Sequence, residues 1–437
     1  MNICSFHSDK KSLRSFLCTF RIDSTKKKIP TRMGSFCCAV NSMRRAHLRE
    51  VFSLLKRNIF LMYAISFFQG MVFYGSVATL YRQACGLTLF QITAIESIFS
   101  VVCIALEFPW GVIADRIGYR RTMLFCNLLF FISKIVFWKA DTFGAFLCER
   151  LILSVVISGL SGVDDTVLFL SCGKQDAQRV FSIHGYFGTL GMVIASGCFS
   201  LFFSENFRAA AFWTVAAYAL AALLSFGLQE VGAPKAQSLR KQLSSFRPAF
   251  LFQNQFIVFL LAMAVIQEVY QLMLVFLSQP LYLQAGWSTA SMGAAHIALQ
   301  LLSMSVLFSD SITKRWSARR FLLFLPALSA LCSFLLAFRV PSAVLFAAIA
   351  AIQICCSLLG PLQTNVQNQS ITDENRATAL SVQSLFMRVI AIGINLIVGR
   401  ISEISLSSAL LACSALCFIS LVCVVFWQRL PMYRRKK

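Results

Sequence analysis

The sequence predicts an all-α polytopic membrane protein with twelve transmembrane helices in two pseudo-symmetric six-helix halves. Of its 437 residues, 58% are hydrophobic and only 13% are charged, whereas soluble domains average about 45–50% apolar and about 25% charged residues. A water-soluble fold could not bury this much apolar surface, so soluble enzymes, disordered chains and disulfide scaffolds are excluded. The apolar runs are continuous rather than alternating, which excludes a transmembrane β-barrel.

The number of spans follows from the length of the apolar runs, because one crossing needs about 20 apolar residues. We expect the spans at 58–80, 90–113, 121–140, 143–172, 180–203, 207–228, 251–279, 288–309, 319–338, 341–366, 376–401 and 405–428. The fourth, seventh and tenth are long enough to tilt or kink. We expect a break at Gly360–Pro361 in the tenth, because proline removes a backbone donor and clashes with the preceding turn.

The basic residues predict the orientation of the chain in the membrane. An even number of spans places both termini on one side, and the loops of that side carry most of the lysines and arginines. The opposite side is expected to hold only Arg82, Lys139, Arg208, Arg339 and Arg400. We therefore expect a multi-pass protein of the plasma (inner cytoplasmic) membrane with both termini cytoplasmic. This topology accounts for the net charge of +22, so no nucleic-acid partner is needed.

The chain divides into two helical halves flanked by basic segments. The expected segments are a basic N-terminal tail at 1–57, six-helix halves at 58–228 and 251–428, a cytoplasmic linker at 229–250 and a basic tail at 429–437. Within the N-terminal tail, residues 43–57 fit an amphipathic helix on an anionic inner leaflet. Residues 1–42 are expected to be a disordered tail, or to precede a true start of the chain at Met33 or Met43.

Short sequence matches support an internal repeat. Leu80–Ala84 reads LYRQA and Leu281–Ala285 reads LYLQA, and each stretch ends an odd-numbered span, the first and the seventh. Two parallel repeats with a site between them are a common arrangement of such folds.

Between the second and third spans, Gly111 to Arg121 reads G-V-I-A-D-R-I-G-Y-R-R. This stretch resembles the signature loop of the major facilitator superfamily, G-x-x-x-D-R-x-G-x-R-R, at every fixed position. Together with the spans and the repeat, the resemblance covers residues 58–437. The chain resembles bacterial-type members of this superfamily, and no subfamily is assigned. It implies secondary transport by alternating access. Nothing in the sequence indicates an enzyme, because it holds no phosphate-cradling loop.

The resemblance also assigns roles within the loop. Gly111 allows a close helix approach, Gly118 permits a tight turn, and Asp115 can face the N-terminal end of span eleven. In the family this network latches the two halves in the outward-facing state. We therefore expect a conformational latch rather than substrate binding from Gly111, Asp115, Arg116, Gly118, Arg120 and Arg121. Span five carries Gly185, Gly188, Gly191 and Gly197, which favours close packing.

Ionisable residues inside a membrane are costly and usually face the interior of the helix bundle. Glu268 lies near the middle of the seventh span and is a candidate for carrying protons, with a structural buried pair as the alternative. Asp164, Asp165 and Glu96 are further candidates for proton coupling. Lys134, near the outer end of the third span, is expected to snorkel toward the membrane surface.

Further polar residues on inner helices are candidates for the substrate cavity. Arg388 can hold an anionic substrate group or balance Glu268, whereas Arg150 and Glu96 can pair toward the outer ends of their spans. His296 is either titratable or a packing residue. The complete set is Arg388, Arg150, Gln69, Tyr74, Gln271, His296 and Gln353.

We expect a monomer that moves a small molecule, coupled to protons, and that binds no cofactor and no metal. The sixteen cysteines include no CxxC pair and no cluster with zinc spacing. The 42 phenylalanines favour efflux of drug-like or amphipathic compounds, because some of them should line the cavity. Uptake of a small polar nutrient, such as a sugar, amino acid or organic acid, is the main alternative. A non-transporting sensor and a lipid flippase are the others.

Overall fold

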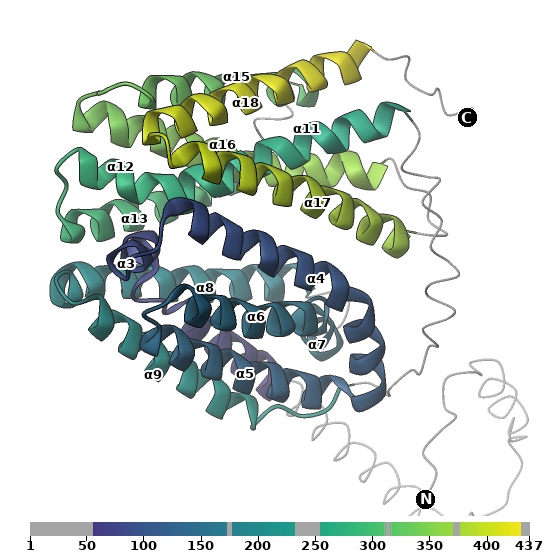
Figure 1. Cartoon of the computed structure of the whole chain (residues 1–437). Coiled ribbons are helices and arrows are strands. Elements are labelled where there is room, and N and C mark those ends of the chain that lie inside the picture. Colours follow the sequence, from purple (N-terminus) through teal and green to yellow (C-terminus); the bar gives the residue numbers. More distant parts are fainter. Residues whose placement is uncertain are drawn as a thin grey trace, which may run out of the picture. The chain divides into compact units, whose positions relative to one another are not determined.

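The computed structural model describes residues 56–172, 177–231, 254–309, 311, 315, 317–369 and 376–429. The predicted N-terminal tail with its helix at 43–57, the last tail and most of the linker lie outside these ranges. In the part described, the regular elements are helices (Figure 1), and twelve spans are long and apolar enough to cross a membrane. The first runs from Lys56 to Ala84 and the last from Leu406 to Arg429. The predicted fold class is confirmed.

The helical elements follow the predicted spans closely. In the first half they are a helix over 56–70, η1 (Gly75–Val77), α3 (Ala78–Ala84), α4 (Leu89–Ile117), α5 (Tyr119–Lys139), α6 (Phe143–Leu160), α7 (Val163–Cys172), α8 (Ala177–Cys198), η2 (Phe199–Phe203) and α9 (Phe207–Ser225). In the second half they are α11 (Asn254–Gln271), η4 (Leu272–Leu277), α12 (Ser278–Gln284), α13 (Thr289–Ser303), η5 (Met304–Phe308), α15 (Ala318–Leu336), α16 (Ser342–Gln369), α17 (Arg376–Ser402) and α18 (Leu406–Arg429).

The spans alternate in direction, so the first begins and the last ends at one end of the bundle. We call this the proximal end and the opposite one the distal end. In Figure 1 the distal end, with α3, α12 and α13, lies to the left, and the starts of α11 and α17 lie to the right.

Several spans depart from regular α-helix. The first is broken at 71–74, before the 3-10 turn η1, and the seventh continues from α11 through the π-helical segment η4. The fourth is interrupted between α6 and α7, where Gly162 has a φ of 77°. The fourth and seventh are two of the three spans for which kinks were predicted.

The predicted break of the tenth span is wrong. The helix α16 continues through Pro361 to Gln369. The Ser357 hydroxyl donates to the carbonyl of Gln353, and the Thr364 hydroxyl donates to the carbonyl of Gly360, so both bond within the helix. Proline is tolerated in membrane helices, where neighbouring helices and small local adjustments compensate for the missing backbone donor.

Spans one and five touch through their glycines. A Cβ atom added at Gly191 would lie 2.1 Å from the carbonyl oxygen of Phe67, and one added at Gly70 would lie 2.1 Å from the carbonyl oxygen of Gly188. Only glycine allows two backbones to approach so closely. The close packing expected of span five is therefore a backbone contact with span one.

We predict that Gly191→Ala destabilises the protein, because the added methyl group forces spans one and five apart at a cost of about 1–3 kcal/mol. Gly185→Ala is the matched control on α8, since a Cβ there meets nothing within 4 Å. Thermal unfolding of the purified protein in detergent measures both. Equal melting temperatures for the two variants would contradict the contact.

Candidate functional site

The first and last six spans meet at the distal end through a side chain that caps a helix of the other half. The buried Gln279 on α12 accepts hydrogen bonds with its Oε1 from the backbone N–H of Thr79, at 2.7 Å, and of Leu80, at 3.3 Å. The Thr79 hydroxyl donates to the carbonyl of Val275 at 3.0 Å. The segments LYRQA and LYLQA are thus held side by side.

Other hydrogen bonds between the halves also lie toward the distal end. His296 Nδ1 lies 2.8 Å from the Ser196 hydroxyl, and Ser200 donates to the carbonyl of Ala290 at 2.9 Å. These contacts join the distal part of the fifth span to the distal part of the eighth. In the described part of the chain, the two halves are therefore joined by hydrogen bonds on this side.

A cavity lies toward the proximal end, between α11, α16 and α17. Its volume is about 360 Å³. The residues that line it are Ala264, Gln267, Glu268, Gln363, Gln367, Gln383, Ser384, Met387, Arg388 and Ala391. Glu268 lies roughly 20 Å along α11 from Asn254, at ~1.5 Å per residue, so the cavity reaches the middle of the bundle.

The cavity holds one acid and one base that sequence analysis had singled out, Glu268 and Arg388. The described residues form no ion pair with either of them within 4 Å. The Asn395 side chain is buried on α17 and lies close to the Glu268 carboxylate. Both charges are therefore available to a molecule in the cavity.

Most of the remaining polar lining consists of glutamine side chains. Gln267 donates from Nε2 to Gln363 Oε1 at 2.7 Å, which links α11 to α16. Gln367 and Gln383 were not predicted as cavity residues. Helical spacing could have identified Gln383, because it precedes Met387 by four residues and Ala391 by eight on α17, on the face that carries the cavity.

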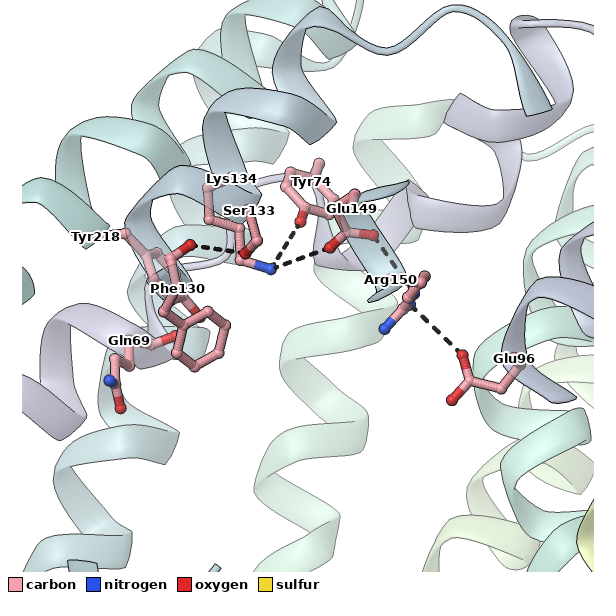
Figure 2. Close-up of polar contacts among 9 residues, drawn as sticks. All are labelled: Gln69, Tyr74, Glu96, Phe130, Ser133, Lys134, Glu149, Arg150 and Tyr218. Atoms are coloured by element: carbon pink, nitrogen blue, oxygen red, sulfur yellow. Dashed lines mark hydrogen bonds and ion pairs between the residues drawn. The ribbon is translucent and has the colours of Figure 1, made fainter. Parts of the chain in front are cut away.

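A second set of charges lies inside the first half (Figure 2). Lys134 Nζ is 3.9 Å from Glu149 Oε1 and 3.3 Å from the Tyr74 hydroxyl. Arg150 is 3.5 Å from Glu149 Oε2 with its Nε and 3.7 Å from Glu96 Oε2 with Nη2. These four charged side chains form a continuous network across α5, α6 and α4.

The structure corrects two expectations about basic residues of the first half. Lys134 does not snorkel to the surface, because its side chain is only 8% exposed and points to Glu149. Arg82 is not in an outer loop but is 4% exposed, with its guanidinium over the Phe137 and Phe146 rings. Sequence analysis missed Glu149, which comes directly before Arg150 in the chain.

The other predicted site residues lie away from the cavity lining. The Gln69 amide bonds to Asn127, and His296 bonds to Ser196 between the halves. Asp164 accepts from the backbone N–H of Asp165 at the start of α7. Tyr74 stacks on Phe137 with ring centroids 4.1 Å apart. Gln271 is exposed on α11, and the Gln353 amide lies 3.5 Å from the Ser357 hydroxyl.

The predicted signature loop contacts the end of span six. Glu230 accepts from the backbone N–H of Tyr119 and Arg120, at 2.9 and 3.3 Å, and Arg120 donates from Nε to the carbonyl of Leu228. Gly118 has a φ of 93°, and a Cβ there would lie 2.7 Å from Glu230 Oε2. Arg116 and Arg121 are exposed. The surroundings of Gly111 and the side chain of Asp115 lie outside the described residues.

The comparisons establish the family. The model of the Major Facilitator Superfamily matches residues 59–394, and no curated protein matches the chain. The chain belongs to the major facilitator superfamily. It is a multi-pass membrane transporter of the secondary type, and its family implies a small-molecule substrate.

Solved structures share the fold at low sequence identity. A variant of the nucleoside transporter NupG has a TM-score of 0.71 at 16% identity and covers 85% of this chain and 99% of its own. The D-xylose–proton symporter has a TM-score of 0.65 at 12% identity, over 87% of this chain and 97% of that one. A bacterial homologue of the human lysosomal transporter Spinster, inward-facing and unoccupied, scores 0.62 at 18% identity, over 86% and 95%.

We predict that Glu149→Gln lowers the melting temperature more than Lys134→Met does. Losing Glu149 leaves two buried cations with Glu96 alone, and an uncompensated buried charge costs about 3–5 kcal/mol. Losing Lys134 leaves Glu149 paired with Arg150. Thermal unfolding in detergent ranks the variants. Asp141→Asn, which removes the exposed ion pair with Arg208, is the control for a surface charge. The opposite ranking would contradict the network.

Proposed function

We propose that this transporter moves a small polar solute by alternating access, with Glu268 carrying the coupled proton. The observation that carries the proposal is the cavity, which reaches mid-depth and holds an acid without an ion-pair partner among the described residues. Intramembrane acids of this kind are typical of proton relays in transporters.

The contacts between the halves support a state that is open toward the proximal end. Hydrogen bonds join the halves at the distal end, while the cavity lies toward the proximal end. The signature loop makes its described contacts to the end of span six in its own half. Alternating access then requires the distal contacts to break as the proximal side closes.

The lining favours a polar solute over an amphipathic one. It contains glutamine, serine, glutamate and arginine side chains with alanines and one methionine, and no aromatic residue lines this described cavity. The expectation that phenylalanines line the cavity is not met there. A volume of about 360 Å³ is at the small end of ligand sites, which span about 300–1,000 Å³.

We also propose that the protein lies in the plasma membrane with its proximal end facing the cytoplasm. The distribution of basic residues supports this orientation. Arg116, Arg121, Arg179, Arg319 and Arg320 are exposed at or near the proximal ends of their spans. At the distal end, Arg82 is buried, and the exposed basic residues of the described part are fewer: Lys139, Arg208, Arg339 and Arg400, of which Arg208 and Arg400 pair with acids. This asymmetry is what the positive-inside rule requires, and basic loops suit an anionic inner leaflet.

We predict that Glu268→Gln abolishes solute-dependent proton flux, because an amide of the same shape cannot bind and release a proton. The measurement uses proteoliposomes that contain a pH-sensitive dye and face pools of sugars, nucleosides, amino acids and drug-like amines. Glu403→Gln is the control, since this acid lies at the distal end and pairs with Arg400.

Three results would contradict parts of the proposal. Unchanged flux in Glu268→Gln would exclude Glu268 as the proton carrier. Flux with the drug-like pool alone would favour efflux of amphipathic compounds over the polar solute. Ligand binding without any flux would favour a sensor.

A further inference from the structure

One buried amide in the cavity has no partner. Gln383, on α17, is 1% exposed, and neither its Nε2 nor its Oε1 makes a hydrogen bond within the described structure. A buried polar group left without a partner costs about 1–3 kcal/mol. Because this amide lines a cavity, a bound molecule can supply the missing bonds.

Two neighbouring amides are poorly satisfied as donors. Gln363 Nε2 and Gln367 Nε2 both point to the Met387 sulfur, at 3.5 and 3.8 Å. A thioether sulfur is a weak acceptor, so a better acceptor would displace it readily. The cavity therefore carries one amide with an unused donor and acceptor, and two more donors in weak bonds.

We propose that this glutamine cluster, Gln363, Gln367 and Gln383, is a subsite for a planar amide-type group with an N–H donor beside a C=O acceptor. Cyclic amides, imides and carboxamides have this pattern. The inference rests on the proposed transport of a small polar solute and names the chemical group by which the solute is recognised.

The pattern of donors and acceptors separates this class from others. An amide group satisfies both atoms of Gln383 at once, because each partner offers one donor and one acceptor side by side. A carboxylate offers acceptors only, so it leaves Gln383 Oε1 without a donor, and its natural partner in the lining is Arg388 rather than the glutamine cluster. An ammonium group offers donors only and leaves the three amide nitrogens unsatisfied.

The subsite has a signature that a purely structural glutamine would not show. Gln383→Leu removes an unsatisfied buried amide and keeps a side chain of similar size. We therefore expect the unliganded variant to melt at the same or a higher temperature than the wild type, while it loses ligand binding. Stability and binding then change in opposite directions, as is common at binding sites.

The test measures binding to the full-length protein in detergent by calorimetric titration and thermal shift. Two matched pairs of probes isolate the amide: uracil against 1,3-dimethyluracil, which lacks both N–H donors, and nicotinamide against nicotinate. D-Xylose and succinate represent the polyol and anion classes. Gln428→Leu is the matched control variant, because its amide bonds to the carbonyl of Arg319, outside the cavity.

We expect an amide probe to bind at least about tenfold more tightly than its matched partner, which corresponds to losing one buried hydrogen bond. Gln383→Leu should weaken that binding at least about tenfold, Gln367→Leu should weaken it less, and Gln428→Leu should leave it unchanged. Wild-type binding in Gln383→Leu, or binding of D-xylose or succinate with both amide probes inert, would overturn the subsite alone. Failure of every probe to bind, together with no flux in proteoliposomes, would overturn both this inference and the proposed function.

Discussion

The break in the first span leaves backbone N–H groups without partners in their own helix, and a side chain of the seventh span accepts hydrogen bonds from them. A new helix, α3, starts inside the bundle after this break, and the first backbone N–H groups of a helix have no partner within it. Its N-cap residue, Val77, provides no side-chain bond. Gln279 of the other half accepts from Thr79 and Leu80 instead. Because water is scarce there and an unsatisfied N–H costs several kcal/mol, this capping bond between the halves holds the distal end closed.

The two sets of buried charges have different roles, because only the set in the first half is paired. In the first half, Lys134, Glu149, Arg150 and Glu96 form ion pairs at 3.5 to 3.9 Å, and these pairs link α4, α5 and α6. In the second half, Glu268 and Arg388 face a cavity without an ion pair within the described residues. Charges that are already paired are poor ligands, whereas unpaired charges at a cavity can respond to a proton or a solute.

Hydropathy and one motif were enough to predict the spans and the family, because the membrane imposes long apolar helices and the signature loop keeps its fixed positions. The side-chain partners were harder to predict. Lys134 could point outward or inward, and only the rotation of α5 against α6 decides that it meets Glu149. The role of Gln279 could not be predicted from the sequence, because its partners are backbone N–H groups that become available only at an unpredicted break in the first span. The continuation of α16 through Pro361 could not be predicted, because it depends on the helices that pack around the proline.

The central claim is that Gln279 holds the distal end closed and that transport requires its release. Spin labels at Ala84 and Gln284, both exposed at the distal end, would report the separation of the halves by double electron–electron resonance. Genetically encoded labels avoid the 16 native cysteines. The account predicts a short-distance population in the wild type, and a shift of that population to longer distances in Gln279→Leu. The same narrow distribution in both proteins would contradict it.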